Sequence, residues 1–229
     1  MIASQEPKVT STQAMTDSKH ELTEREAREA EIRAACEQGD YQRATTTLLQ
    51  TYAEELLSFL VVRLGDRSHA DDAFSLLAED LWIGLPKFEF RSSVRTWAYT
   101  VARHVAARYA RTPARKKDRN LTLSKNVQLS QLVEQLRTRT EAYRRSDVKS
   151  EIRALRDKLD AEAQMLLVLR VDRQMSWRDL ALVMSSSEES ANSIPDEAAL
   201  EREAARLRKR FERVKAELKQ LAQQAGLLP

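Results

Sequence analysis

The chain has 229 residues, of which 42% are hydrophobic and 32% are charged, and its formal net charge is +3. Four glycines and five prolines are too few for the turns of a many-stranded sheet, so the composition predicts an all-α fold. The single cysteine, Cys36, excludes an intrachain disulfide and a cysteine-based zinc cluster. No metal-ligand spacing, nucleophile motif or phosphate-binding glycine loop is present, and we expect no enzyme, no metal and no cofactor.

The sequence predicts neither a signal peptide nor a membrane-spanning segment. No basic start followed by an apolar segment stands at the N-terminus, so no signal peptide is predicted. The longest apolar stretch, residues 56–62, is too short to cross a bilayer. These features favour a cytoplasmic protein with no membrane contact.

Residues 1–40 are predicted to be a partly disordered N-terminal extension. Residues 1–20 are rich in Ser, Thr and Gln, which is typical of disorder, and residues 21–38 have the composition of a charged helix. A second helix is expected to follow, because apolar residues recur at helical spacing from Leu48 to Leu60 and stop before Gly65.

A third helix is predicted over residues 69–85, where Pro86 stops it. One stripe of this helix is apolar and should face the core: Phe74, Leu77, Leu81 and Leu85. The opposite side combines two large aliphatic residues with three acids: Asp72, Leu76, Glu79, Asp80 and Ile83. Aliphatic residues on an acidic outer face favour a docking surface for another protein.

A loop over residues 86–93 leads into a helix over residues 94–111. Residues 91–119 hold nine basic groups against one acid, Asp118, and this clustering favours a polyanionic partner. Val94, Ala98, Val101, Val105 and Tyr109 form the expected buried stripe of the helix. Its far side carries small alanines with Arg95, Tyr99 and Arg103, and is predicted to be exposed and to contact nucleic acid.

Residues 112–146 are interpreted as a basic linker that contains a weaker helix near 128–145. A second unit, residues 147–229, contains an apolar helix over 161–171 and a helix over 176–184 that Ser176 and Asp179 should cap. An acidic loop, 185–199, precedes the last helix. Apolar residues repeat at steps of three and four from Leu200 to Leu221, and this pattern fits both a DNA recognition helix and a coiled-coil seam.

Two parts of the chain resemble a known family. HADDAFSLLAEDLWIGLPKF (69–88) with SSVRTWAYTVARHVAARYAR (92–111) resembles the second region of bacterial RNA polymerase sigma factors of the extracytoplasmic-function (ECF) subfamily. DAEAQMLLVLRVDRQMSWRDLALVM (160–184) with RLRKRFERVKAEL (206–218) resembles the fourth region. The resemblance implies two small helical domains, region 2 over 41–111 and a helix-turn-helix region 4 over 147–229, joined by the linker.

The resemblance also implies partners and roles. The partners are core RNA polymerase, promoter DNA and an anti-sigma factor, and the function is promoter recognition, DNA melting and transcription initiation. Core polymerase would contact Asp72, Leu76, Glu79, Asp80 and Ile83. The minus-ten element would contact Phe88, Arg91, Ser92, Ser93, Arg95, Tyr99 and Arg103. The minus-thirty-five element would contact Trp177, Arg178, Arg206, Lys209 and Arg213.

Two features depart from the family pattern, and two other functions stay open. The Gln-Glu pair common after the aspartate pair is Ser75-Leu76 here, and the acidic stretch 185–199 replaces a tight turn.

The first alternative function is a helix-turn-helix regulator that binds DNA without polymerase. The second is a coiled-coil adaptor that self-associates through residues 200–221.

Overall fold

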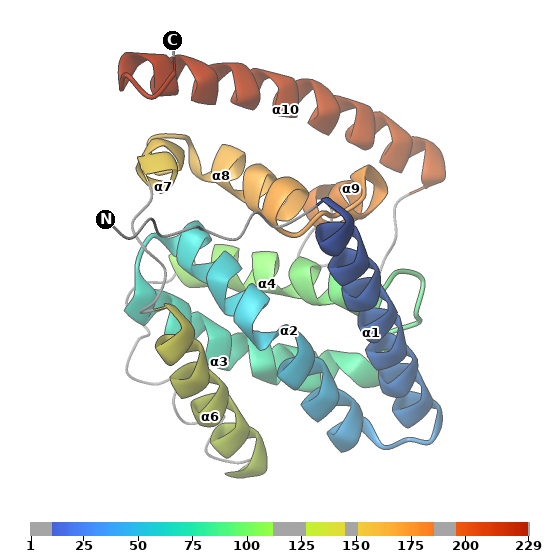
Figure 1. Cartoon of the computed structure of the whole chain (residues 1–229). Coiled ribbons are helices and arrows are strands. Elements are labelled where there is room, and N and C mark those ends of the chain that lie inside the picture. Colours follow the sequence, from blue (N-terminus) through green and yellow to red (C-terminus); the bar gives the residue numbers. More distant parts are fainter. Residues whose placement is uncertain (1–10, 112–126, 145–150, 186–195, 229) are drawn as a thin grey trace, which may run out of the picture.

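The structure is a computed structural model that describes residues 11–111, 127–144, 151–185 and 196–228. The described part is almost entirely helical and contains no strand, which confirms the all-α prediction (Figure 1). The helices are α1 (Ser11–Glu37), α2 (Tyr41–Leu64), α3 (Arg67–Gly84), η1 (Leu85–Lys87), α4 (Val94–Arg111), α6 (Val127–Arg144), α7 (Glu151–Arg156), α8 (Ala161–Leu167), the π-helical turn η3 (Val168–Asp172), α9 (Trp177–Ser185) and α10 (Glu197–Gln224).

Helices α2, α3 and α4 pack on one another to form the first bundle. Local signals set their ends: the Asp40 carboxylate accepts the backbone N–H of Arg43 at 3.0 Å, and the Asp66 carboxylate accepts that of His69 at 2.8 Å. Gly65, with φ of +69°, closes α2 in the left-handed conformation that glycine adopts without strain. The predicted inner stripe of α3 is confirmed, since all four of its residues are buried.

Helix α1 packs on α2 as part of this bundle, although residues 1–40 are predicted to be an N-terminal extension. Ile32 and Ala35 of α1 are buried in the same core as α2. The predicted disorder of residues 1–20 is wrong for residues 11–20, which are helical, while residues 1–10 lie outside the described part. The charged helix predicted over residues 21–38 is present, but its polarity concealed its packing, because only a narrow apolar edge with Ile32 and Ala35 meets the core.

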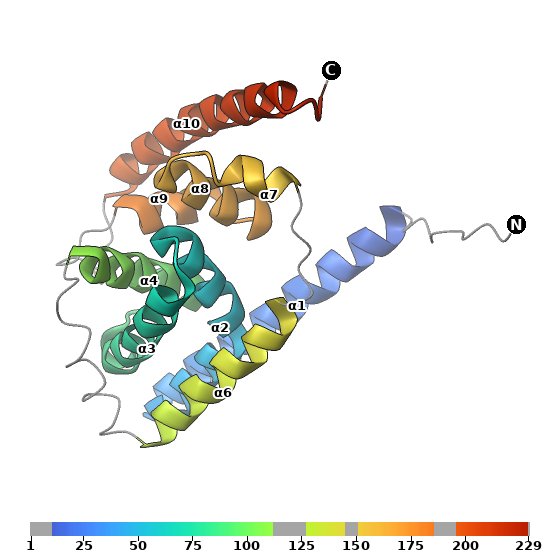
Figure 2. The same ribbon diagram turned by 90° about the vertical axis from the view of Figure 1, so that its left-hand side faces the viewer.

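The predicted linker also contains a packed helix. Its segment 112–126 lies outside the described residues, but α6 lies against α2 and α3, and Leu129, Val133 and Leu136 are buried there. In Figure 2, α6 and α1 overlap in the view, and Figure 1 shows that α2 lies between them. The first bundle therefore comprises α1–α4 and α6.

Helices α7–α10 form the second bundle. The predicted cap of α9 is confirmed: Ser176 Oγ accepts the N–H of Asp179 at 3.0 Å and donates to the Asp179 carboxylate at 2.6 Å. The apolar stripe of α10 packs inside the chain. Its first part, with Leu200 and Leu207, lies in one core cluster with Leu180 of α9, and Val214 lies with Leu159, Ala163 and Leu167.

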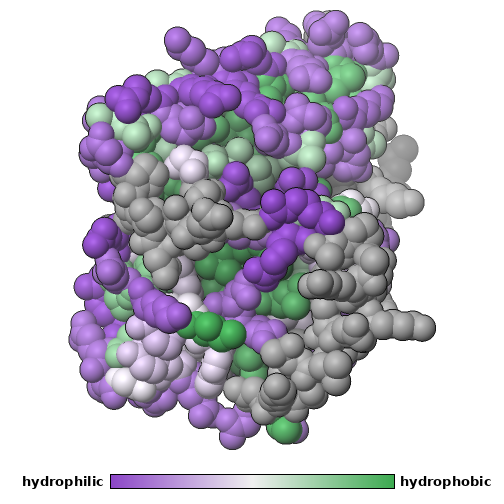
Figure 3. Space-filling view, turned by 180° about the vertical axis from the view of Figure 1, so that it is seen from behind, coloured by the Kyte–Doolittle hydropathy of each residue, from purple (hydrophilic) through white to green (hydrophobic). Residues whose placement is uncertain are grey.

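The two bundles are in contact with each other. Helix α4 packs on α9, and α2 packs on α8 (Figure 1). One continuous hydrophobic core therefore crosses both bundles. The outer face of α10 is strongly hydrophilic at the top of the view in Figure 3. Within the described residues, no helix is both long and apolar enough to span a bilayer.

Candidate functional site

The outer face of α3 carries the predicted docking residues. Ile83 is 56% exposed, as expected, but Leu76 is only half-exposed and packs against the core. Two of the acids face α4: Asp72 accepts the Tyr109 hydroxyl at 3.0 Å, and Asp80 pairs with Arg108 at 2.8 Å. These bonds hold the Asp72 and Asp80 carboxylates in place on the side of α3 that carries Ile83.

An aromatic stack holds the loop that follows α3. The Phe88 ring lies 4.8 Å from the Trp97 ring at an interplanar angle of 22°, and 4.7 Å from the Phe90 ring. Gly84 makes room for this stack, because a Cβ atom there would lie 3.0 Å from the Trp97 ring. Phe90 has a φ of +54°, an uncommon conformation for a bulky residue that costs on the order of 1–3 kcal/mol.

The next loop residues lead directly into α4. Arg91 is exposed and pairs with Glu89 at 2.6 Å. Ser93 Oγ accepts the N–H of Thr96 at 3.0 Å and acts as an N-cap for α4. The neighbouring Ser92 hydroxyl donates to the Ser93 carbonyl at 3.2 Å. The four predicted loop residues, Phe88, Arg91, Ser92 and Ser93, therefore lie together at the start of α4.

Glu29 of α1 holds the first turn of α4. Its carboxylate accepts the backbone N–H groups of Val94 at 2.7 Å and Arg95 at 2.9 Å, and also the Tyr52 hydroxyl at 2.8 Å. The first N–H groups of a helix have no partner within the helix, and a carboxylate there also interacts favourably with the helix dipole. The pKa of Tyr52 is raised by burial and by this carboxylate. Glu29 thereby fixes α1 against α2 and α4.

Arg95 and Tyr99 are not on an exposed surface, and this prediction is wrong. Arg95 is 7% exposed and Tyr99 is fully buried with its ring 5.4 Å from that of Phe59. The Arg95 guanidinium donates twice to the Glu55 carboxylate, at 2.8 and 2.7 Å, and once to the Arg173 carbonyl at 3.0 Å. Burial disfavours the charge of Arg95, but the bonds to Glu55 outweigh it and raise its pKa.

The reason for the burial is that α4 has neighbours on two sides. Its predicted stripe from Val94 to Tyr109 packs into the first bundle as expected, while its other side meets α2 and α9. At this second contact, Thr96 Oγ donates to the Asp179 carboxylate at 3.1 Å, and Arg173 lies 3.8 Å from Glu55. Arg103, the third residue of the predicted basic face, is half-exposed.

The predicted minus-thirty-five residues divide into two groups. Trp177 is half-buried between α9 and α10, with its ring 5.6 Å from Phe211 and the Arg170 guanidinium 4.8 Å above it. Arg178 forms a two-point bond with Glu197 at 3.1 and 2.9 Å, which raises the pKa of Arg178 and lowers that of Glu197. The others share an exposed face of α10: Arg206, Lys209 and Arg213.

Of the predicted acidic loop 185–199, residues 186–195 lie outside the described part of the chain. Within the part of the chain that the structure describes, no group of three His, Cys, Asp or Glu side chains could hold a metal ion.

Sequence reasoning missed the partners of α4. Glu29, Glu55, Arg173 and Asp179 contact the first turn of α4 or the side chains of Arg95 and Thr96. The first three had only the pattern of a charged helix surface or a loop, and Asp179 was predicted only as part of the cap of its own helix. They lie 40 to 83 positions away from the α4 residues that they bind. Glu29 lies about two turns before the end of α1. This position could have predicted its contact with α4 only if α1 was already known to pack against α4.

Comparison with known proteins adds to this geometry. Residues 48–116 match the family model of sigma-70 region 2, which covers α2 from Leu48 through α4. The chain is 31% identical over 159 residues to the RNA polymerase sigma factor YlaC of Bacillus subtilis (strain 168), and the match covers 67% of this chain and 87% of that relative. No solved structure matches the chain.

The role of Glu29 leads to a stability prediction. Glu29→Ala leaves two backbone N–H groups of α4 and the Tyr52 hydroxyl without their acceptor, so it should lower the free energy of unfolding by about 1–3 kcal/mol. Glu29→Gln keeps an oxygen acceptor but loses the charge, and should cost less. Urea unfolding followed by circular dichroism measures both. Glu26→Ala, an exposed acid on the same helix, is the control, and equal stability of the Ala variants would contradict the assigned contact.

Proposed function

The chain belongs to the RNA polymerase sigma factors of the ECF subfamily and is a non-enzymatic transcription initiation factor, and from this we propose that it binds core polymerase through α3 and promoter DNA through α4 and α10. The match of residues 48–116 to sigma-70 region 2 carries this proposal. In this region the exposed Ile83 and the acids on its side of α3 lie close to the loop and to the start of α4. Polymerase and minus-ten contacts are then made by one rigid bundle.

The polymerase contact is proposed for the Ile83 side of α3. An exposed isoleucine on the same side of α3 as Asp72, Glu79 and Asp80 suits a partner surface with an apolar spot among basic residues. Leu76 contributes less to this contact than its position on the helix suggested, because the core of the protein already covers part of it.

The minus-thirty-five contact is proposed for α10. Arg206, Lys209 and Arg213 lie on a face that the bundle leaves exposed, while the apolar stripe is used within the chain. This internal use of the stripe leaves little apolar surface for self-association, so it argues against the coiled-coil adaptor. Trp177 and Arg178 are proposed to hold α9 and α10 together beside the DNA rather than to read bases.

The minus-ten contact requires a change in the arrangement of the two bundles. Arg95, Thr96 and Tyr99 lie beneath α9 and η3, where promoter DNA cannot reach them. We therefore propose that α9 and α10 move away from α4 when the chain binds polymerase. Extruding a base costs a few kcal/mol, and stacking on an aromatic side chain returns about 1–3 kcal/mol per base.

The remaining partners and the location follow from the family. A sigma factor acts where the polymerase works, which places the proposed activity in the cytoplasm. An anti-sigma factor stays an expectation of the family resemblance.

The general test is transcription with purified components. Core polymerase alone should not start at defined sites on genomic DNA, and adding the chain should produce a small set of starts that share an upstream sequence. The chain alone should bind these promoters at least tenfold more weakly than the complete complex. Tight and selective binding without polymerase would instead favour the helix-turn-helix regulator.

The docking proposal predicts the effect of one substitution. Ile83→Arg should weaken core polymerase binding at least tenfold, equivalent to about 1.4 kcal/mol, because a charge replaces an apolar contact at the interface. Its melting temperature should stay unchanged, since Ile83 is exposed. Val127→Arg, at an exposed valine of α6, is the control. Equal affinities of the two variants, measured by biolayer interferometry, would remove Ile83 from the docking surface.

If the two bundles separate on polymerase binding, the distance between α3 and α10 should increase. Spin labels at Ser68→Cys on α3 and Gln220→Cys on α10, in a Cys36→Ser background, should give a longer distance distribution by electron paramagnetic resonance once core polymerase is added. Thr96→Val removes the bond to Asp179 and should raise the fraction of long distances in the free protein, whereas Thr138→Val on α6 should not. A distribution that polymerase leaves unchanged would contradict the proposed opening.

A further inference from the structure

Helix α6 covers one side of the first bundle by packing on α2 and α3. Leu129, Val133 and Leu136 are buried in the core there, and their spacing by four and three places them on one stripe of the helix. Positions between them, such as Gln135, are exposed. The family match ends at residue 116, so it assigns no role to α6.

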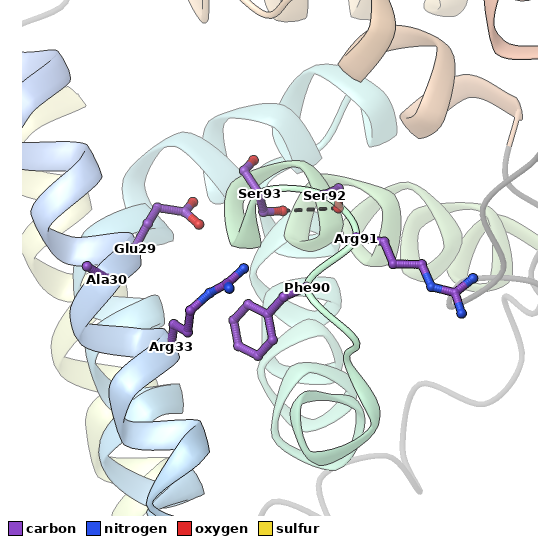
Figure 4. A pocket seen from close by; sticks show the side chains of 7 residues that line it. All are labelled: Glu29, Ala30, Arg33, Phe90, Arg91, Ser92 and Ser93. Carbon is purple, nitrogen blue, oxygen red and sulfur yellow. Dashed lines mark hydrogen bonds between the residues drawn. The ribbon is translucent and has the colours of Figure 1, made fainter. Parts of the chain in front are cut away.

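The ion pair that joins α6 to α3 is weaker than the contacts that hold α1. The Glu29 carboxylate points from α1 toward the start of α4 (Figure 4) and accepts two backbone N–H groups at 2.7 and 2.9 Å. Arg137 of α6 lies farther from its partner, with 3.8 Å between Nη2 and the Asp71 carboxylate. Ion pairs of this kind near the surface contribute little to stability. A short apolar stripe and a long ion pair suit a helix that can leave its site.

Asp71 lies on the same row of α3 as the proposed polymerase contact. The row consists of residues spaced by four along the helix: Asp71, Ser75, Glu79 and Ile83. At one end of the row Arg137 lies against Asp71, whose side chain is only 15% exposed, whereas Ile83 at the other end is 56% exposed. A basic partner surface that covers Ile83 and Glu79 therefore also reaches Asp71, and competes with Arg137 for its charge.

The chain after α6 limits how far the second bundle can move. Six residues join Arg144, the last residue of α6, to Glu151, the first residue of α7. A connection of this length spans at most about 25 Å when it is fully extended. Figures 1 and 2 both show α6 running toward the second bundle at its later end. A docked α6 therefore keeps the second bundle close to the first.

The proposed promoter contacts require a much larger separation. Positions minus ten and minus thirty-five are about 25 base pairs apart, which is roughly 85 Å along straight B-DNA. In the closed form α9 packs on both α4 and α10, so the axes of these two helices are about 20 Å apart. Moving the second bundle away from a docked α6 adds at most about 25 Å. Once α6 is released, the chain from Arg111 to Glu151 can span about 100 Å even if α6 stays helical.

We propose that α6 is a releasable strap that keeps the free chain closed, and that core polymerase displaces it by binding along the Asp71–Ile83 row of α3. Basic residues of the polymerase replace Arg137 at Asp71, and the apolar surface that α6 uncovers on α2 and α3 is covered by the same partner. The chain between the bundles then becomes long enough for both promoter contacts. This inference rests on the proposed function, which supplies the competing partner and the distance.

The first test follows the distance between α6 and α2. Spin labels at Gln135→Cys and Gln50→Cys, two exposed positions, are placed in a Cys36→Ser background. Electron paramagnetic resonance should give one short distance in the free protein and longer distances in most molecules once core polymerase is added. A longer distance between α3 and α10 with an unchanged distance between α6 and α2 would overturn the strap. If neither distance changes in the polymerase complex, the proposed opening is contradicted and the strap with it.

The second test releases α6 by substitution. Val133→Asp places a charge in the apolar contact, whereas Gln135→Asp adds the same charge at an exposed position of the same helix and is the matched control. Val133→Asp should raise the affinity for core polymerase about threefold or more, because a larger fraction of the free chain is already open. The control should bind like the wild type. Biolayer interferometry measures both affinities.

The outcomes separate the strap from the proposed function. An unchanged affinity of Val133→Asp would overturn the strap, and so would a reduced affinity, which would make α6 part of the polymerase contact. Val133→Ala is the milder variant and should shift the affinity in the same direction if Val133→Asp does not fold. A wild-type chain that does not bind core polymerase would contradict the sigma activity itself, and the strap proposal would fall with it.

Discussion

The buried charge of Arg95 constrains the structure around it more than any other interaction. A guanidinium that is 7% exposed must have its donors satisfied, because an unpaired buried charge costs about 3–5 kcal/mol. Glu55 of α2 and the carbonyl of Arg173 in the second bundle satisfy it at 2.7 to 3.0 Å. The positions of α2, α4 and the turn after η3 are therefore fixed relative to one another by a single side chain.

The first turn of α4 is where the rest of the fold converges. Glu29 brings α1 to its backbone, Asp179 brings α9 to Thr96, and Trp97 anchors the aromatic stack of the preceding loop. The same turn begins the RTWAYTVAR segment that gives the chain its resemblance to sigma factors. Packing contacts and proposed DNA contacts thus compete for one short stretch of helix.

This competition gives the proposed opening a physical basis. A partner shifts an equilibrium between closed and open forms only by the difference in its affinity for the two. Core polymerase supplies that difference if it binds the open form more tightly than the closed form. The polar contacts between the bundles, namely Arg95 with Arg173, Thr96 with Asp179 and Arg173 with Glu55, can be replaced by water or phosphate once the bundles separate.

The sequence alone determined most of the helices and the apolar stripes of α3, α4 and α10, because these depend on local signals. Gly65, Pro86 and Ser176 mark helix ends through caps and ring geometry, and a period near 3.6 identifies a buried stripe on α3, α4 and α10. Only the tertiary structure decided that Tyr99 and Arg95 are buried and that Glu29 of α1 binds the first turn of α4. Periodicity reports the polarity of one helix, but not how many neighbours it has. The partners of Arg95 are 40 and 78 residues away, and no local pattern connects them.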